Sequence, residues 1–135
     1  MAEYVLNTPT AVAVGNAVPY NNTAVKGCYN VRHRTGSGIV TIKGGSCQRP
    51  SLYDVEFHGN VTGVAGSIQL ALYLDGEILP ETLMSVVPAT ATDVVSVGTR
   101  TQIQTDCNCS SISARVVTGD AVTVNTASII VRKEV

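Results

Sequence analysis

A strand-like run near the middle of the chain carries the residues with the clearest capacity for chemistry. Asp54, Glu56 and His58 occupy every second position, so in a β-strand their side chains would lie on one face. Carboxylates and an imidazole can bind a metal ion or perform acid–base catalysis. The residues that alternate with them are apolar: Tyr53, Val55 and Phe57. Because this alternation is typical of an antiparallel sheet with one solvated face, we expect the polar set to form that outer face, and we predict no metal site.

The cysteines are the second group with chemical potential: Cys28, Cys47, Cys107 and Cys109. The C-x-C spacing of the last two lacks the further ligands and the wider spacing of a zinc site. Four cysteines allow three disulfide pairings, and the sequence does not choose among them. The N-terminus shows no basic region followed by an apolar run, so we expect no signal peptide and mostly free thiols. In oxidising surroundings, a disulfide between Cys28 and Cys47 would clamp the hairpin that we expect over residues 27–43.

His33 shares a strand face with Tyr29 and Val31, whereas Arg32 and Arg34 lie on the opposite face. This placement predicts a packed or hydrogen-bonded histidine rather than a catalytic base. We expect the two arginines to be solvated, and their alternative role is contact with an acidic partner or a glycan. The sequence contains no serine-nucleophile elbow, phosphate loop, dinucleotide fingerprint or zinc-protease motif. We therefore predict no enzymatic activity and no cofactor.

The size and composition of the chain limit the function classes further. A chain of 135 residues corresponds to one domain. Its net charge is −1, and the longest run of Lys and Arg is Arg132-Lys133, so charge gives no reason to expect nucleic-acid binding. No stretch approaches the roughly 18 apolar residues of a membrane span, so we expect no membrane insertion. We expect residues 1–9 to be a polar lead-in available for docking and residues 10–135 to form the domain.

The pattern of apolar residues predicts an all-β fold. Residues 67–80 read S-I-Q-L-A-L-Y-L-D-G-E-I-L-P, with apolar residues at every second position of the first half. Asp75-Gly76 tolerates positive φ and suits a tight hairpin turn, and we expect this hairpin to be the central structural unit. No helical period persists, and turn signals recur through the chain. We therefore expect about eight to ten short strands that form a sandwich or a barrel of antiparallel sheets.

Several strands carry apolar residues on both faces, as in Val94-Val95, Val116-Val117 and Ile129-Ile130-Val131. One face of a sandwich strand meets the core, so a second apolar face needs another cover. We expect that cover to be a second copy of the chain. The interface candidates are the following: Tyr73, Val94, Val117 and Ile130.

The order of these signals resembles the trimeric jelly-roll domains of the tumour-necrosis-factor and complement-head type. It is most similar to the C-terminal domain of collagen-like exosporium and surface proteins of Firmicutes and to related phage virion proteins. Five segments carry the resemblance: V-A-V-G-N-A-V-P-Y-N-N-T at 12–23, G-I-V-T-I at 38–42, Y-D-V-E-F-H-G-N-V at 53–61, I-Q-L-A-L-Y-L-D-G-E at 68–77 and G-D-A-V-T-V-N-T-A-S-I-I-V at 119–131. The collagen-like stalk of the Firmicute proteins does not precede the domain, which favours a free-standing trimer or a virion component.

The resemblance implies a jelly-roll homotrimer with a non-enzymatic structural role on the outside of a larger particle. We expect that particle to be a bacteriophage virion, with the chain as capsid decoration or as a head or tail fibre. One alternative is a trimeric module that binds a carbohydrate or a receptor through loops at residues 44–51, 88–93 and 106–110. A second alternative is an exosporium, coat or filament-forming protein on a spore or cell surface.

Overall fold

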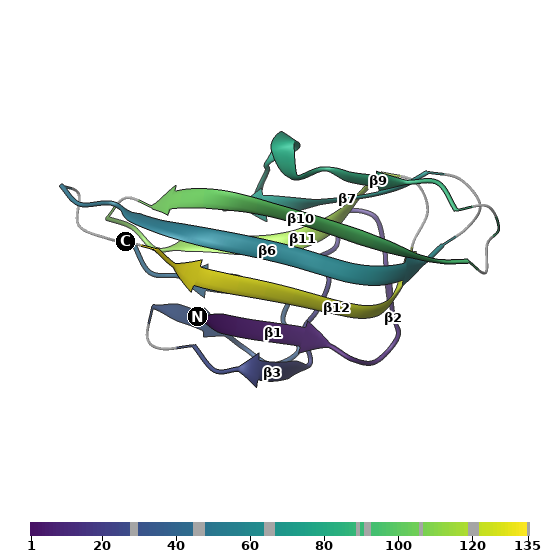
Figure 1. Ribbon diagram of the computed structural model, residues 1–135, viewed down its shortest axis with the longest axis horizontal. Coiled ribbons are helices and arrows are strands. Elements are labelled where there is room, and N and C mark those ends of the chain that lie inside the picture. The colour runs from purple at the N-terminus through teal and green to yellow at the C-terminus, as the bar shows by residue number, and fades with distance from the viewer. Residues whose placement is uncertain are drawn as a thin grey trace.

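The computed structural model describes residues 1–27, 30–44, 48–63, 67–88, 90, 93–105, 107–118 and 122–134. Twelve strands within these ranges form two six-stranded antiparallel sheets that pack face to face (Figure 1). The first sheet has the order β10-β6-β12-β1-β3, with β2 also paired to β12, and its strands are β1 (Ala2–Leu6), β2 (Thr10–Val12), β3 (Asn22–Val25), β6 (Ser51–Thr62), β10 (Val94–Thr105) and β12 (Val122–Lys133). The second sheet has the order β4-β5-β11-β7-β8, with β9 also paired to β7, and its strands are β4 (Val31–His33), β5 (Val40–Ile42), β7 (Ile68–Leu74), β8 (Glu77–Ile78), β9 (Met84–Val86) and β11 (Ser110–Thr118). The prediction of an all-β, two-sheet antiparallel sandwich is confirmed.

Three long strands, β10, β6 and β12, dominate the first sheet and run side by side in Figure 1. Tyr53, Val55 and Phe57 on β6 are fully buried against the second sheet, as the alternation predicts. Gly59 continues this inward row, and a Cβ there would lie 2.9 Å from the carbonyl oxygen of Thr126. The register of β12 shifts beside this position, between Val124 and Thr126. A side chain has no room at Gly59, so the backbones of β6 and β12 approach each other closely there.

The hairpin of residues 67–80 forms as predicted, but it is not central. β7 turns into β8 through Asp75 and Gly76, whose φ angles of 52° and 85° suit a two-residue turn of the type found in tight hairpins. β7 is paired with β11 on one side, and the short strands β8 and β9 cover its other side. The 3₁₀ turn η1 (Pro80–Thr82) lies between β8 and β9. The hairpin therefore forms one edge of the second sheet, because local turn chemistry specifies the hairpin but not its neighbours.

The segment after β2 connects the two sheets. The sequence predicts one strand through residues 10–19, whereas β2 ends at Val12. Beyond it, the amide of Gly15 donates to the carbonyl of Val116 at 2.8 Å, and the amide of Val18 donates to Ala114 at 2.8 Å. These partners lie on β11, so the chain leaves the first sheet after β2 and pairs with the second. Positive φ at Gly15, 84°, permits the turn.

The prediction that residues 1–9 are a polar lead-in outside the domain is wrong for β1. This strand is paired with β12 on one side and β3 on the other, which places it inside the first sheet. Ala2, Tyr4 and Leu6 are buried, and burial of the two larger side chains stabilises the fold by roughly 1.5–3 kcal/mol each. The expected domain boundary at residue 10 therefore lies within the sheet rather than before it.

Candidate functional site

The carboxylate–histidine face of β6 is not a uniformly solvated surface. His58 is exposed and Glu56 is half-buried, but Asp54 is 2% exposed, so the expected solvation is wrong for Asp54. The guanidinium of Arg100 on β10 donates two hydrogen bonds to Asp54, from Nε at 2.9 Å and from Nη2 at 2.6 Å. Nη1 of Arg132 on β12 lies 3.8 Å from the same carboxylate. The carboxylate is therefore neutralised from both neighbouring strands and can be buried.

The charges of this ion-pair cluster are paired with one another, as in a cluster that stabilises the fold. The hydrogen bonds and the negative charge of Asp54 raise the pKa of the Arg100 guanidinium. Within the described ranges, no three His, Cys, Asp or Glu side chains converge as metal ligands would. Sequence reasoning missed Arg100 because it lies 46 residues from Asp54, and only the pairing of β10 with β6 brings the two together.

The described cysteines are in different states. Cys107 is disulfide-bonded, so the expectation of a free thiol is wrong there. Cys109 is free and exposed, which agrees with that expectation. The predicted clamp between Cys28 and Cys47 lies outside the described residues.

His33 is a packed and hydrogen-bonded histidine, as predicted. Its Nε2 lies 2.7 Å from the carbonyl oxygen of Ser37, and since a carbonyl only accepts, Nε2 carries the proton. The imidazole lies between two aromatic rings, with centroids 4.6 Å away at Tyr4 and 5.6 Å away at Tyr20. Nδ1 of His33 and the hydroxyl of Tyr20 are both buried and have no partner among the described residues. Desolvation raises the pKa of the Tyr20 phenol.

The predicted interface residues fall on two different surfaces. Val94 is 61% exposed and Ile130 is half-buried, and both lie on the outer face of the first sheet. Tyr73 and Val117 are half-buried on the outer face of the second sheet, where the guanidinium of Arg115 stands 5.3 Å from the Tyr73 ring. Fewer apolar side chains lie on the outer faces of the strands than the sequence analysis expected. Val116, Ile129 and Val131 point into the core and are fully buried.

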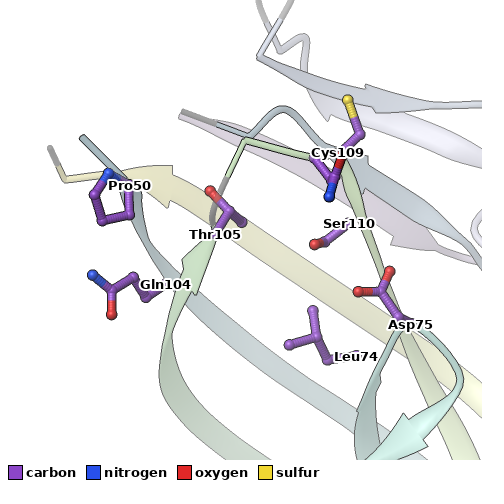
Figure 2. Close-up of a pocket in the computed structure, with 8 residues that line it drawn as sticks. Pro50, Leu74, Asp75, Gln104, Thr105, Cys109 and Ser110 are labelled. Carbon is purple, nitrogen blue, oxygen red and sulfur yellow. The ribbon is translucent and has the colours of Figure 1, made fainter. Parts of the chain in front are cut away.

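A hollow of about 480 Å³ opens at one end of the sandwich, where β7 and β10 end and β11 begins (Figure 2). Two of the predicted contact loops line it, 44–51 through Pro50 and 106–110 through Asn108 and Cys109. Figure 2 shows the Asp75 carboxylate and the Ser110 hydroxyl directed into the hollow, whereas the Cys109 sulfur points away. The third predicted loop, 88–93, lies at the other end of β10, roughly 40 Å away along a 12-residue strand.

The hollow can bind a ligand but has no set of groups for catalysis. Asp75 and Cys109 are the titratable groups among the described lining residues, and the Asp75 carboxylate accepts a hydrogen bond from the amide of Ser111 at 2.9 Å. Hydroxyl and amide side chains supply the remaining polar atoms. No acid–base pair or nucleophile–base pair is brought together there. Among the described residues, there is also no helix with the length and apolarity that crossing a membrane requires.

Comparison with solved structures identifies the fold. The globular domain of zebrafish complement 1qA protein superposes with a TM-score of 0.69 at 13% identity, covering 96% of this chain and 94% of that chain. The Eiger TNF of S. frugiperda gives 0.64 at 10% identity, covering 99% and 90%. The PRD1 vertex protein P5 gives 0.54 at 9% identity, covering 95% and 93%. No protein-family model matches the chain, and no curated protein matches it significantly.

The chain is therefore an all-β sandwich with the tumour-necrosis-factor and complement-head fold. The fold part of the predicted resemblance is confirmed, and the absence of enzymatic activity remains a prediction. At these identities the likeness extends to the fold alone. The link to Firmicute surface proteins remains a prediction.

Proposed function

We propose that this chain is a non-enzymatic structural protein that forms a homotrimer on the outside of a larger particle. The observation that carries the proposal is a row of exposed aliphatic side chains at one edge of the sandwich, which we call the apolar edge: Ile78 (38% exposed), Leu83 (45%), Val87 (73%) and Val94 (61%). Ile78 belongs to β8, Leu83 follows η1, Val87 follows β9 and Val94 begins β10, and both η1 and β9 lie beside β10. Aliphatic side chains gathered in this way favour a protein partner.

The outer face of the first sheet is suited to be covered by that edge. Several of its polar groups are already paired within the chain, beginning with the Asp54–Arg100 ion pair. The hydroxyl of Ser128 donates to Glu3 at 2.7 Å. The amide of Asn60 donates to a threonine hydroxyl on β12 at 2.9 Å and accepts from a serine hydroxyl on β10 at 2.7 Å. Covering such a face leaves few polar groups without partners, which lowers the cost of desolvation.

Gly98 is a second reason to expect an interface on the outer face of the first sheet. It lies on the outer side of β10 opposite His58. A Cβ at Gly98 would come no closer than 3.6 Å to any atom, and its φ is not positive, so the protomer itself does not require glycine. A glycine inside a strand costs roughly 0.5–1 kcal/mol. A neighbouring subunit that lies close to this flat position would explain why it carries no side chain.

Contact between an edge of one copy and a face of the next joins two different surfaces. Such head-to-tail contacts close into a ring when the rotation between copies allows it. A stable interface buries about 800 Å² per partner. Three copies arranged in this way also agree with the trimeric state that the fold resemblance implies.

The preferred particle is a virion, where the chain would be a capsid decoration or a head or tail fibre. The support is that the PRD1 vertex protein P5 shares the fold over 93% of its length. Immunolabelling of purified virions and purified spores separates this location from the exosporium or coat alternative. Labelling of spores alone would refute the virion assignment.

Sedimentation equilibrium tests the trimer. The expected mass is three times the 14.1 kDa of one chain. Leu83→Asp should release monomers, because a carboxylate cannot be buried in an apolar contact without a partner. Ile39→Asp is the matched control. Ile39 has the same exposed fraction, 45%, but it lies next to β5, on the other side of the second sheet from β8. A stable monomer at micromolar concentration, or equal effects of the two variants, would refute the proposed interface.

A further inference from the structure

The positive charge of this chain is concentrated in one segment. Residues 4–53 contain five Lys or Arg residues and no Asp or Glu. Residues 54–135 contain four Lys or Arg and nine Asp or Glu, so the net charge of −1 hides a strong asymmetry. The basic segment supplies β3 and β4, the edge strands of the two sheets on the side away from β10, and β5 beside them. That side of the sandwich therefore attracts anions.

Three hollows adjoin one another along this side, and we call them together the basic track. The first hollow encloses about 640 Å³ between β3 and β4 and is lined by Lys26 and Arg32 among others. The second encloses about 180 Å³ and shares Arg32 with the first, adding Lys43 and Cys109. Cys109 also lines the third hollow, the end hollow of Figure 2. Neighbouring hollows therefore have a lining residue in common, Arg32 for the first two and Cys109 for the last two.

Two cations of the first hollow have no described partner. Lys26 and Arg32 are exposed, and their side chains form no ion pair or hydrogen bond with any described residue. Tyr4 and His33 also line this hollow, where the Tyr4 hydroxyl donates to the carbonyl of Val31 at 3.5 Å and His33 Nε2 donates to that of Ser37. In the first two hollows, the described lining residues include no carboxylate. Bound negative charge would therefore meet Lys26 and Arg32 without displacing a described partner.

We propose that the basic track binds an extended anionic polysaccharide, with acid groups of the polymer paired with Lys26 and Arg32. Acid groups and sugar hydroxyls match a lining of cations, amides and hydroxyls, to which Asn30 and Thr41 contribute. The volume of the first hollow lies within the range of ordinary ligand sites. The track lies within one protomer, so this binding does not rest on the proposed trimer.

Two features favour a polysaccharide over other polyanions. Single-stranded nucleic acid binds on exposed aromatic rings, but the rings that the structure describes near the track, Tyr4 and Tyr20, are buried at 4% and 0% exposure. An acidic peptide would bring apolar side chains that need apolar pockets. The second hollow has no aliphatic side chain among its described lining residues.

Calorimetric titration of the full chain tests the proposal with four probes: an oligogalacturonate, an oligomer of glycerol phosphate, a neutral malto-oligosaccharide and a single-stranded oligonucleotide. We expect binding to an acidic oligomer, whether its anion is a carboxylate or a phosphate, and none to the neutral sugar. Arg32→Gln should weaken binding roughly ten- to hundredfold, the usual effect of losing a charge-assisted hydrogen bond. Arg34→Gln removes the same charge from an exposed position of the same segment that lines none of the three hollows, and should change affinity less than about twofold.

The thiol of Cys109 provides a second measurement. It is free, and Cys109 lines the second hollow, so bound polysaccharide should slow its alkylation by iodoacetamide, as measured by peptide mass spectrometry. Equal weakening by Arg32→Gln and Arg34→Gln would show attraction to net charge only and would overturn the site. Unchanged alkylation under saturating oligosaccharide, binding of the neutral sugar, or preferred binding of the oligonucleotide would also overturn it. Thermal unfolding of both variants confirms that the comparison is made between folded proteins.

Discussion

Replacing Gly98 with valine separates the stability of the protomer from the strength of its association. A Cβ at this position would lie 3.6 Å from the nearest atoms, the His58 Cβ and the Phe57 carbonyl oxygen, which is an ordinary van der Waals distance. A β-branched residue is favoured in a strand, where glycine is not. We therefore expect Gly98→Val to stabilise the isolated protomer by about 0.5–1 kcal/mol.

The same substitution should weaken the trimer. The added isopropyl group stands on the outer face of β10, where the proposed neighbour lies close. Overpacking a contact costs about 1–3 kcal/mol per site, so the association constant for each contact should fall roughly five- to 150-fold. The two effects have opposite signs, and an unfolded or damaged protein could not produce both.

Two measurements follow these effects separately. Sedimentation equilibrium over a range of concentrations gives the association constant, and thermal unfolding at a concentration that dissociates the wild-type trimer gives the stability of the protomer. Ser111→Val, on the outer face of the second sheet, is the matched control and should leave association unchanged. If Gly98→Val raises stability but leaves the trimer intact, the outer face of the first sheet is solvated and the proposed interface is wrong.

The other predictions concern the core, the thiol and the assembly. Tyr20→Phe should raise the free energy of unfolding by about 1 kcal/mol, because it removes a buried hydroxyl without a described partner. Tyr53→Phe should lower the free energy of unfolding by about 1 kcal/mol, because it removes the 2.8 Å hydrogen bond to a carbonyl. Chemical denaturation of both variants checks the signs. Burial raises the folded-state pKa of the Tyr20 phenol above the unfolded value near 10. The free energy of unfolding should therefore not depend on this phenol below about pH 10 and should fall above it, as the unfolded chain loses the proton first. Tyr20→Phe should reduce that alkaline loss of stability in pH-dependent unfolding. Oxidation should produce a disulfide-linked dimer on a non-reducing gel, and Cys109→Ser should abolish that band. Leu83→Asp should leave the affinity for a short acidic oligosaccharide unchanged. It should lower the affinity for a long polymer roughly a hundredfold or more, because a trimer binds the polymer at several sites. Equal losses of affinity for both ligands in titrations would contradict this.

Features that depend on local chemistry could be predicted from the sequence. The hairpin through Asp75 and Gly76 forms because both residues adopt positive φ, and the inward row of β6 forms because large apolar residues alternate with polar ones. Those signals lie within a few residues of one another, and they need no knowledge of which strands become neighbours.

Features that depend on strand order could not be predicted in this way. Residues 1–9 contain enough polar side chains to suggest a lead-in, yet the alternation of Ala2, Tyr4 and Leu6 is sufficient for a strand once β12 and β3 lie on either side. Asp54 resembles any outward carboxylate until β10 and β12 bring Arg100 and Arg132 beside it. The position of a buried charge is decided by register, which no short stretch of sequence specifies.

The outer surfaces of the two sheets differ in a way that assigns them different partners. On the first sheet, Asp54 is paired with its arginines and Glu3 accepts a hydrogen bond from Ser128, so the buried charge of this face is already compensated. On the side formed by β3, β4 and β5, Lys26 and Arg32 have no described partner. A copy of the same chain, with a net charge of only −1, offers little to uncompensated cations, whereas it can cover a compensated face at low desolvation cost. The compensated face therefore suits self-association, and the uncompensated side suits an anionic ligand from outside the trimer.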